Sequence, residues 1–287
     1  MALTYTYADS EELKLIEQEL LPSLEEDDPI LKEFPATEVR SNRVRWEQKD
    51  NYKGLQQLRG LNGAPNHVQR VGAKEYDMAP GVYGEYTTID EKELTERRQW
   101  GTFGDPIGID DLVADAQMYL LQRRLDRRRQ ICWGLVTTGT FSIPHPRGGV
   151  MHTDAFSIQT YTAAVAWGTH ATATPFKDIR AAALKYRGKS VDFGKGAKLY
   201  MNRTTLNNLL LNSNAADAYG RRLPSGATLN TLDETQSILT ANDLPEIVAY
   251  DGGYINESGT FTLFVPDGYA ILIGRRTNGA TIGEYRM

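Results

Sequence analysis

The chain has 287 residues, of which 40% are hydrophobic and 24% charged, the composition of an ordinary globular protein with a normal core. Its net charge of −5 gives the whole chain no electrostatic basis for reading nucleic-acid sequence. The one cysteine, Cys132, excludes an intrachain disulfide and a thiolate metal cluster, so we expect folding in a reducing cytoplasm, with no signal peptide and no membrane span.

The first region in chain order is an acidic N-terminal arm. Residues 9–21 have the pattern of an amphipathic helix, with Leu13, Ile16 and Leu20 on one face. The prolines at positions 22, 29 and 35 then predict an extended lead rather than a further helix. Because ten acidic residues lie between positions 9 and 33, the arm is strongly negative.

Residues 39–94 are predicted to form an extended, glycine-rich hairpin with too little apolar surface to fold alone. Only 12 of these 56 residues are Val, Ile, Leu, Met, Phe or Trp, although residues 43–47 alternate charged and apolar side chains as a half-buried strand does. Such a hairpin is marginal in water, so we expect a neighbouring copy of the chain to cover it. The candidate contact residues are Trp46, Leu55, Leu58, Asn62 and Gly63, the last two forming the predicted loop tip.

The strongest local pattern predicts a long helix from Ile109 to Trp133. Acidic residues occupy its first turns and five arginines its last ones, the polarity that the helix dipole favours. About 25 residues at 1.5 Å each give a rod of roughly 37 Å, long for a globular domain. We expect Gly134 or Gly139 to end it.

After residue 150 the pattern is that of an ordinary mixed domain, which makes the chain α+β. Strands with glycine-bearing turns alternate with short helices. The helices are predicted at 175–187, 203–212 and 233–240, and the strands at 198–201, 246–250, 260–265 and 269–273.

No motif for catalysis, metal binding or cofactor binding stands out. Gly188-Lys189-Ser190 lacks the earlier glycine of a phosphate-binding loop. His145 and His152 share one loop, where solvated histidines are commoner than metal ligands. Cys132 on the long helix fits a buried apolar residue better than a nucleophile. We therefore expect no enzyme activity, no metal and no cofactor.

The arginine run at 123–129 allows two interpretations. In the first it is a solvated helix end; in the second it pairs with carboxylates of another subunit or faces packaged nucleic acid. Arg123 and Arg127 share one helix face and Arg124 and Arg128 another. The acidic residues Glu25, Glu26, Asp27 and Asp28 are obvious opposite-sign partners. We hypothesise that the arm and the helix end meet, within one subunit or between two, as part of an assembly interface.

Three segments carry a resemblance to a known family. They are residues 197–205, a strand leading into a helix, residues 244–254, and the Phe-Val-Pro-Asp-Gly-Tyr segment at 264–269. Together with the order of arm, hairpin, long helix and mixed domain, they resemble the major capsid protein of tailed bacteriophages, and within that group the lambda-type major head protein, or phage major capsid protein E, family. The resemblance implies an N-terminal arm (1–40), an E-loop (41–96), a peripheral domain with a spine helix (97–150) and an axial domain (151–287), whose last strands could also return toward the peripheral domain.

The same resemblance implies a function and partners. A protein of this type self-assembles from hexamers and pentamers into an icosahedral shell that encloses double-stranded DNA. Its partners would be further copies of itself, a portal, a scaffold, a decoration protein in many members, and DNA held by non-specific contact, with no membrane. The protein would be part of the virion capsid and would assemble in the host cytoplasm. Members commonly continue beyond the Pro-Asp-Gly strand pair, whereas this sequence stops at Met287. The alternatives are an encapsulin-like compartment and a soluble α+β enzyme without a recognised motif.

Overall fold

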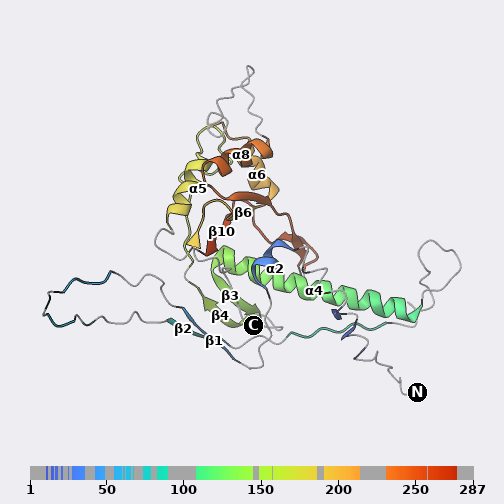
Figure 1. The fold of residues 1–287 in the computed structure, drawn as a ribbon. Coiled ribbons are helices and arrows are strands. Elements are labelled where there is room, and N and C mark those ends of the chain that lie inside the picture. The colour runs from blue at the N-terminus through green and yellow to red at the C-terminus, as the bar shows by residue number, and fades with distance from the viewer. Residues whose placement is uncertain are drawn as a thin grey trace, which may run out of the picture. The chain divides into compact units, whose positions relative to one another are not determined.

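A computed structural model shows a mixed helix-and-strand chain (Figure 1). It divides into two compact units: the first unit is Met1–Pro35 with Gly81–Trp133, and the second is Ala36–Pro80 with Gly134–Met287. The residues that the structure describes are 11, 14–15, 17–18, 21, 25, 28–35, 43–48, 55–59, 61, 63–65, 67, 74–78, 83–89, 108–144, 149–156, 158–185, 191–213, 231–256 and 258–276.

The long helix α4 runs from Ile109 to Thr138, five residues further than the sequence predicted. Its thirty residues give a rod of about 45 Å. Leu121, Leu125 and Cys132 are buried along the helix, as was expected for Cys132. The helix ends at Gly139, which has φ +69° and donates its N–H to the carbonyl of Leu135 at 2.9 Å. Gly134 lies inside the helix because a glycine there costs only about 1 kcal/mol and needs no special backbone angle.

The N-terminal arm contains more helix than predicted. The described positions 11, 14, 15, 17, 18, 21 and 25 are helical, while Leu13, Ile16 and Leu20 lie outside the described residues. A further short helix, α2 (Pro29–Glu33), replaces the extended lead expected at this proline. Pro29 begins the helix because the first turn needs no N–H donor there, so this proline starts a helix rather than preventing one.

Two antiparallel hairpins belong to the second unit (Figure 1). The strand predicted at 43–47 is confirmed as β1 (Val44–Gln48), which pairs with β2 (Lys74–Met78) in the register Val44↔Met78 to Gln48↔Lys74. The second hairpin joins β3 (Thr140–Pro144) to β4 (Val150–Ala155) and was not predicted. Its strands mix polar and apolar residues around a proline-containing loop, so they lack a clear period-two pattern.

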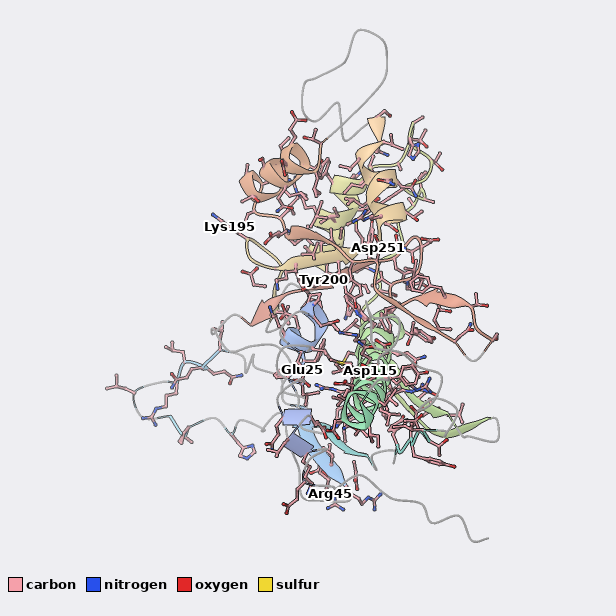
Figure 2. All side chains as sticks on the ribbon, turned by 90° about the vertical axis from the view of Figure 1, so that its right-hand side faces the viewer. Glu25, Arg45, Asp115, Lys195, Tyr200 and Asp251 are labelled. Carbon is pink, nitrogen blue, oxygen red and sulfur yellow. The ribbon has the colours of Figure 1, made fainter. Side chains whose placement is uncertain are left out.

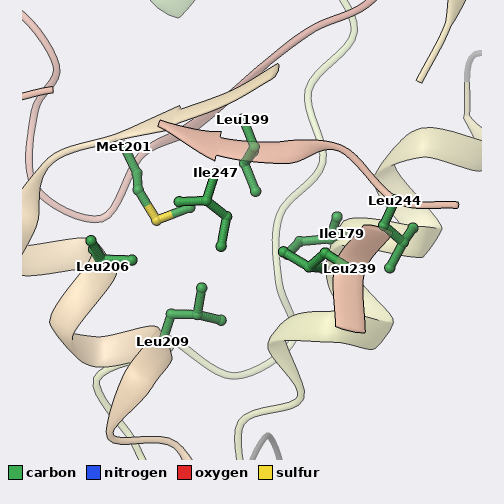
Figure 3. Close-up of a cluster of buried hydrophobic side chains, with 8 residues drawn as sticks. All are labelled: Ile179, Leu199, Met201, Leu206, Leu209, Leu239, Leu244 and Ile247. Carbon is green, nitrogen blue, oxygen red and sulfur yellow. The ribbon is translucent and has the colours of Figure 1, made fainter. Parts of the chain in front are cut away.

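The core of the second unit lies around a three-stranded sheet of order β10–β6–β7. The central strand β6 (Lys198–Met201) is parallel to β7 (Glu246–Ala249) and antiparallel to β10 (Ala270–Ile273). Figure 3 shows the buried cluster that joins sheet and helices. It contains Leu199, Met201 and Ile247 from the sheet, Ile179, Leu206, Leu209 and Leu239 from helices α5 (Pro175–Leu184), α6 (Arg203–Leu210) and α8 (Leu232–Ala241), and Leu244. The predicted elements are confirmed here, with ends shifted by a few residues.

Two small strand pairs complete the described elements. β5 (Val191–Asp192) pairs with β11 (Arg275–Arg276), and β8 (Gly253–Ile255) pairs with β9 (Phe261–Leu263). Gly253 begins β8. A Cβ at this glycine would lie 2.5 Å from the Phe261 ring, so the close approach of that ring requires glycine. Among the residues described, no helix is both long and apolar enough to cross a membrane.

Candidate assembly interface

One face of α4 holds the acidic arm within the same chain. Arg124 forms an ion pair with Glu17, Arg128 with Glu25, and Arg129 Nε donates to Asp28 Oδ2 at 2.6 Å. We call these three pairs the arm clasp. Partner numbers rise together along both segments, so the arm runs in the same direction as the helix. The hypothesised meeting of arm and helix end therefore takes its intrachain form. Glu26 and Asp27 lie outside the described residues.

Asp28 has two structural tasks at the end of the arm clasp. Its Oδ1 accepts the N–H groups of Ile30 at 2.9 Å and Leu31 at 3.3 Å, which caps helix α2. Its other oxygen accepts from Arg129, which Asp126 also contacts at 2.9 Å. Burial lowers the pKa of Arg129, but hydrogen bonding to Asp126 and the charge of Asp28 outweigh this and raise it overall. Because Asp28 is only 5% exposed, its charge is tolerated through these bonds.

The neighbouring face of α4 holds a different segment. Arg123 donates to both carboxylate oxygens of Glu85, at 2.6 and 2.7 Å, and the guanidinium of Arg127 lies 5.8 Å from the ring centre of Tyr83. We call these two contacts the return clasp, since residues 83–85 follow the β1–β2 hairpin in the chain. The hydrogen bonds from Arg123 lower the pKa of the Glu85 carboxyl below its ordinary value. The two helix faces thus secure the segments before and after the hairpin.

The loop between β1 and β2 carries three leucines that no described residue covers. Leu55 is 98% exposed, Leu58 99% and Leu61 102%. We call these three residues the leucine loop. Arg59 between them donates to the carbonyl of Gly63 at 3.2 Å, a bond that closes the tip on itself. Single exposed leucines are ordinary, but three almost fully exposed leucines within seven positions leave an amount of apolar area in water that favours a partner. Leu61 was missed because the sequence pattern marked only the turn beside it.

In the two strands that flank the leucine loop, two described side chains pack within the chain, and cover of the hairpin by a neighbour stays a prediction. Val44 is 7% exposed, and the ring of Tyr76 lies 5.7 Å from that of Phe156, just after β4. On the opposite face, Arg45 donates to Asp77 at 3.2 Å. Trp46 lies in β1 opposite Tyr76, whereas Asn62 falls outside the described residues.

Two of the three segments behind the resemblance, 197–205 and 264–269, meet at Asn202, between β6 and α6. Asn202 is 1% exposed; its Oδ1 accepts the N–H of Thr205 at 2.8 Å, and its Nδ2 donates to the carbonyl of Val265 and to Asp267 at 3.2 and 2.7 Å. We call this set the Asn202 junction. Sequence reasoning noted the strand-to-helix step but not this side chain, although an asparagine directly before a helix is a capping signal.

Next to this junction, the turn after β7 is tied to the start of α6. Asp251 accepts the backbone N–H of Arg203 and pairs with its guanidinium, both at 2.8 Å. Figure 2 shows Asp251 at this turn and Tyr200 inside the unit on β6. The Thr205 hydroxyl accepts the N–H of Gly268 at 2.9 Å, which binds the Pro-Asp-Gly turn to the same helix. The segments that carry the resemblance are therefore hydrogen-bonded to one another around the start of α6.

The groups considered for chemistry give no site among the described residues. Within them, no group of three or more His, Cys, Asp or Glu side chains could hold a metal ion. Burial raises the pKa of the Cys132 thiol to about 11, which keeps it protonated and unreactive. Gly188-Lys189-Ser190 and His145 lie outside the described residues. The geometry is that of packing and ion pairing.

Comparison with known proteins places this geometry in a family. The family model described as phage major capsid protein E matches residues 31–283 of the chain. No curated protein matches it.

Proposed function

The chain belongs to the phage major capsid protein E family and is a bacteriophage capsid structural protein; from that premise we propose that it assembles into an icosahedral shell around double-stranded DNA through its β1–β2 hairpin. The family is one of structural capsid proteins, not of enzymes. In this proposal residues 1–40 are the N-terminal arm, 41–96 the E-loop, 97–150 the peripheral domain and 151–287 the axial domain.

The exposure of the leucine loop is the observation that carries the proposal. Burying a leucine contributes about 1.5–3 kcal/mol, and all three leucines are almost fully exposed in the single chain. In a lattice each copy would place them on a neighbour, so the same small gain is repeated at every subunit contact. Trp46, Leu55, Leu58, Asn62 and Gly63 are the interface residues proposed for this contact.

The charged residues proposed for the interface would support assembly from within the subunit, whereas the leucines would contact a neighbour. Glu25 and Asp28 are bound to α4 arginines in the same chain, and Glu26 and Asp27 are neighbours in sequence. Arg123, Arg124, Arg127 and Arg128 hold the arm and the return segment. We propose that both clasps prepare the subunit for assembly by ordering the segments that precede and follow the hairpin in the sequence. Segments that are already ordered lower the cost of ordering the chain when it binds a neighbour.

The further partners follow from the proposed shell. Hexamers and pentamers of the chain would form its faces and corners, and a portal, a scaffold and a decoration protein would complete assembly. Packaged DNA would contact the inner surface without sequence preference, since phosphate contacts carry no sequence information. Assembly in the host cytoplasm fits a chain whose one cysteine is buried and reduced.

Electron microscopy of the purified protein tests the proposed function. We expect closed shells, or separate pentamers and hexamers, at concentrations where unrelated globular proteins remain monomeric. A compact monomer at all concentrations, in the presence of a scaffold as well as without it, would contradict assembly through the hairpin.

A further inference from the structure

The five arginines of α4 form a basic row, and four of them are paired with acids of the same chain. They occupy positions 123, 124, 127, 128 and 129. Three of them are bound to the arm through the arm clasp, and Arg123 is bound to Glu85. Without these acids the row would be a dense patch of positive charge in a chain that is otherwise net negative.

Chemically, this row suits a phosphate backbone as well as a carboxylate. A guanidinium binds either group through two parallel hydrogen bonds. Arg124 and Arg128 lie one helical turn apart, about 6 Å along the axis, while the phosphates of one DNA strand follow each other every 3.4 Å along the duplex. The two arginines can therefore reach separate phosphates of one strand.

The arm clasp is built so that another polyanion can compete with it. Arg124 is 58% exposed at its side chain although it is paired with Glu17. Ion pairs at such exposure are weak and screened by salt, whereas DNA gains affinity from counterions released at each phosphate contact. Arg128 and Glu25 are less exposed, at 19% and 31%, and the pair of Arg129 with Asp28, at 22% and 6%, holds the arm in place.

We propose that the acidic arm masks a phosphate-binding row on α4: Glu17 and Glu25 occupy Arg124 and Arg128 and so prevent the unassembled subunit from binding DNA. Duplex DNA is taken as the ligand because the proposed function places it inside the shell. The mask is local: it acts through carboxylates that lie on the arginines, not through the net charge of the chain.

Binding of a short DNA duplex to dilute, unassembled full-length protein tests the mask. Fluorescence anisotropy at low salt should show affinity for the E17Q/E25Q variant at least about 10-fold above wild type. The slope of log affinity against log salt should steepen by about 1.8, or 0.9 for each of two added phosphate contacts. Adding R124Q/R128Q to this variant should return both quantities to the wild-type values.

A matched control separates masking from net charge. D233N/E246Q removes two exposed carboxylates from the second unit, so the net charge changes equally while the arm clasp stays intact; its affinity should remain within about 2-fold of wild type. The single variant E17Q, at the most exposed pair, should give about half the change in slope and keeps the test valid if the double variant unfolds.

Equal gains in E17Q/E25Q and D233N/E246Q, or no gain in E17Q and E17Q/E25Q, would overturn the mask. Shell formation by electron microscopy is a separate readout, so a failed mask and a failed capsid function remain distinguishable.

Discussion

The arm clasp and the leucine loop are two candidate contact surfaces that differ in one respect: the first is paired within the chain, and the second is exposed. In the arm clasp, each arginine finds its acid in the same chain, and Asp28 also caps a helix. In the leucine loop, three apolar side chains are 98–102% exposed. Charges in one chain can thus satisfy each other locally, whereas apolar side chains on an extended loop have nothing to fold against. In the proposed assembly, the apolar loop, more than the charged row, is therefore the part that a second subunit would cover.

The largest expected effect comes from removing the apolar surface. Leu58→Ser with Leu61→Ser should raise the concentration required for assembly at least about 100-fold, because each buried leucine contributes about 1.5–3 kcal/mol. Sedimentation velocity measures the assembled fraction, and circular dichroism should show an unchanged fold. Gln56→Ser, in the same exposed loop, is the matched control and should assemble normally. Normal assembly of the double serine variant would remove the loop from the interface.

Breaking a contact that is made within one chain should lower the stability of the subunit itself rather than its assembly. The Asn202 junction is such a contact. Asn202→Ala removes the cap of α6 and leaves buried partners without their bonds, at a cost of about 2–4 kcal/mol. The loss should appear in dilute subunits, as a lower opening free energy for the β6 amides in hydrogen exchange. Asn207→Ala, on the exposed side of α6, should change it little. An unaltered opening free energy in Asn202→Ala would show that the junction does not stabilise the second unit.

The two roles of Asp28, capping helix α2 and pairing with Arg129, can be measured separately. Asp28→Ala removes both the cap of α2 and the pair with Arg129, so we expect a loss of about 2 kcal/mol. Asp28→Asn keeps the cap, since asparagine caps as well as aspartate does, and should cost about half as much. Hydrogen exchange of Leu31 and its neighbours measures both. Equal losses in the two variants would assign the whole effect to the ion pair and none to the cap.

The return clasp should give the smallest effect, seen as a dependence on pH. Arg123 lowers the pKa of Glu85 from its ordinary value of 4.5. The pair therefore contributes fully above the unfolded pKa, and the contribution is lost as pH falls through the lower folded pKa. Both side chains are about half exposed, so we expect well under about 1 kcal/mol. NMR titration of the Glu85 carboxyl should show a higher pKa in R123Q and no change in R124Q; an unchanged value in R123Q would contradict the pairing.

The sequence predicted the helices and strands whose periodicity reflects one buried face. The period-two residues of β1, the arginine-ended helix α4 and the leucine-rich α6 were all recognisable, because their periodicity reflects one buried face. The β3–β4 hairpin and helix α2 were not predicted, since both lie at prolines that read as breaks. Glu17 and Glu85 could not be assigned as arginine partners, because many acids were available and only the folded chain selects among them.

The central claim is that the leucine loop is bare in a single subunit and covered by another copy in the shell. Gln56→Cys places a thiol between the leucines and leaves them intact, while the buried Cys132, with its pKa near 11, stays silent. Maleimide labelling should be fast in dilute subunits and at least about 10-fold slower in assembled particles, as access to the thiol is lost. Equal labelling rates in both states, or slow labelling of the dilute subunit, would contradict the account.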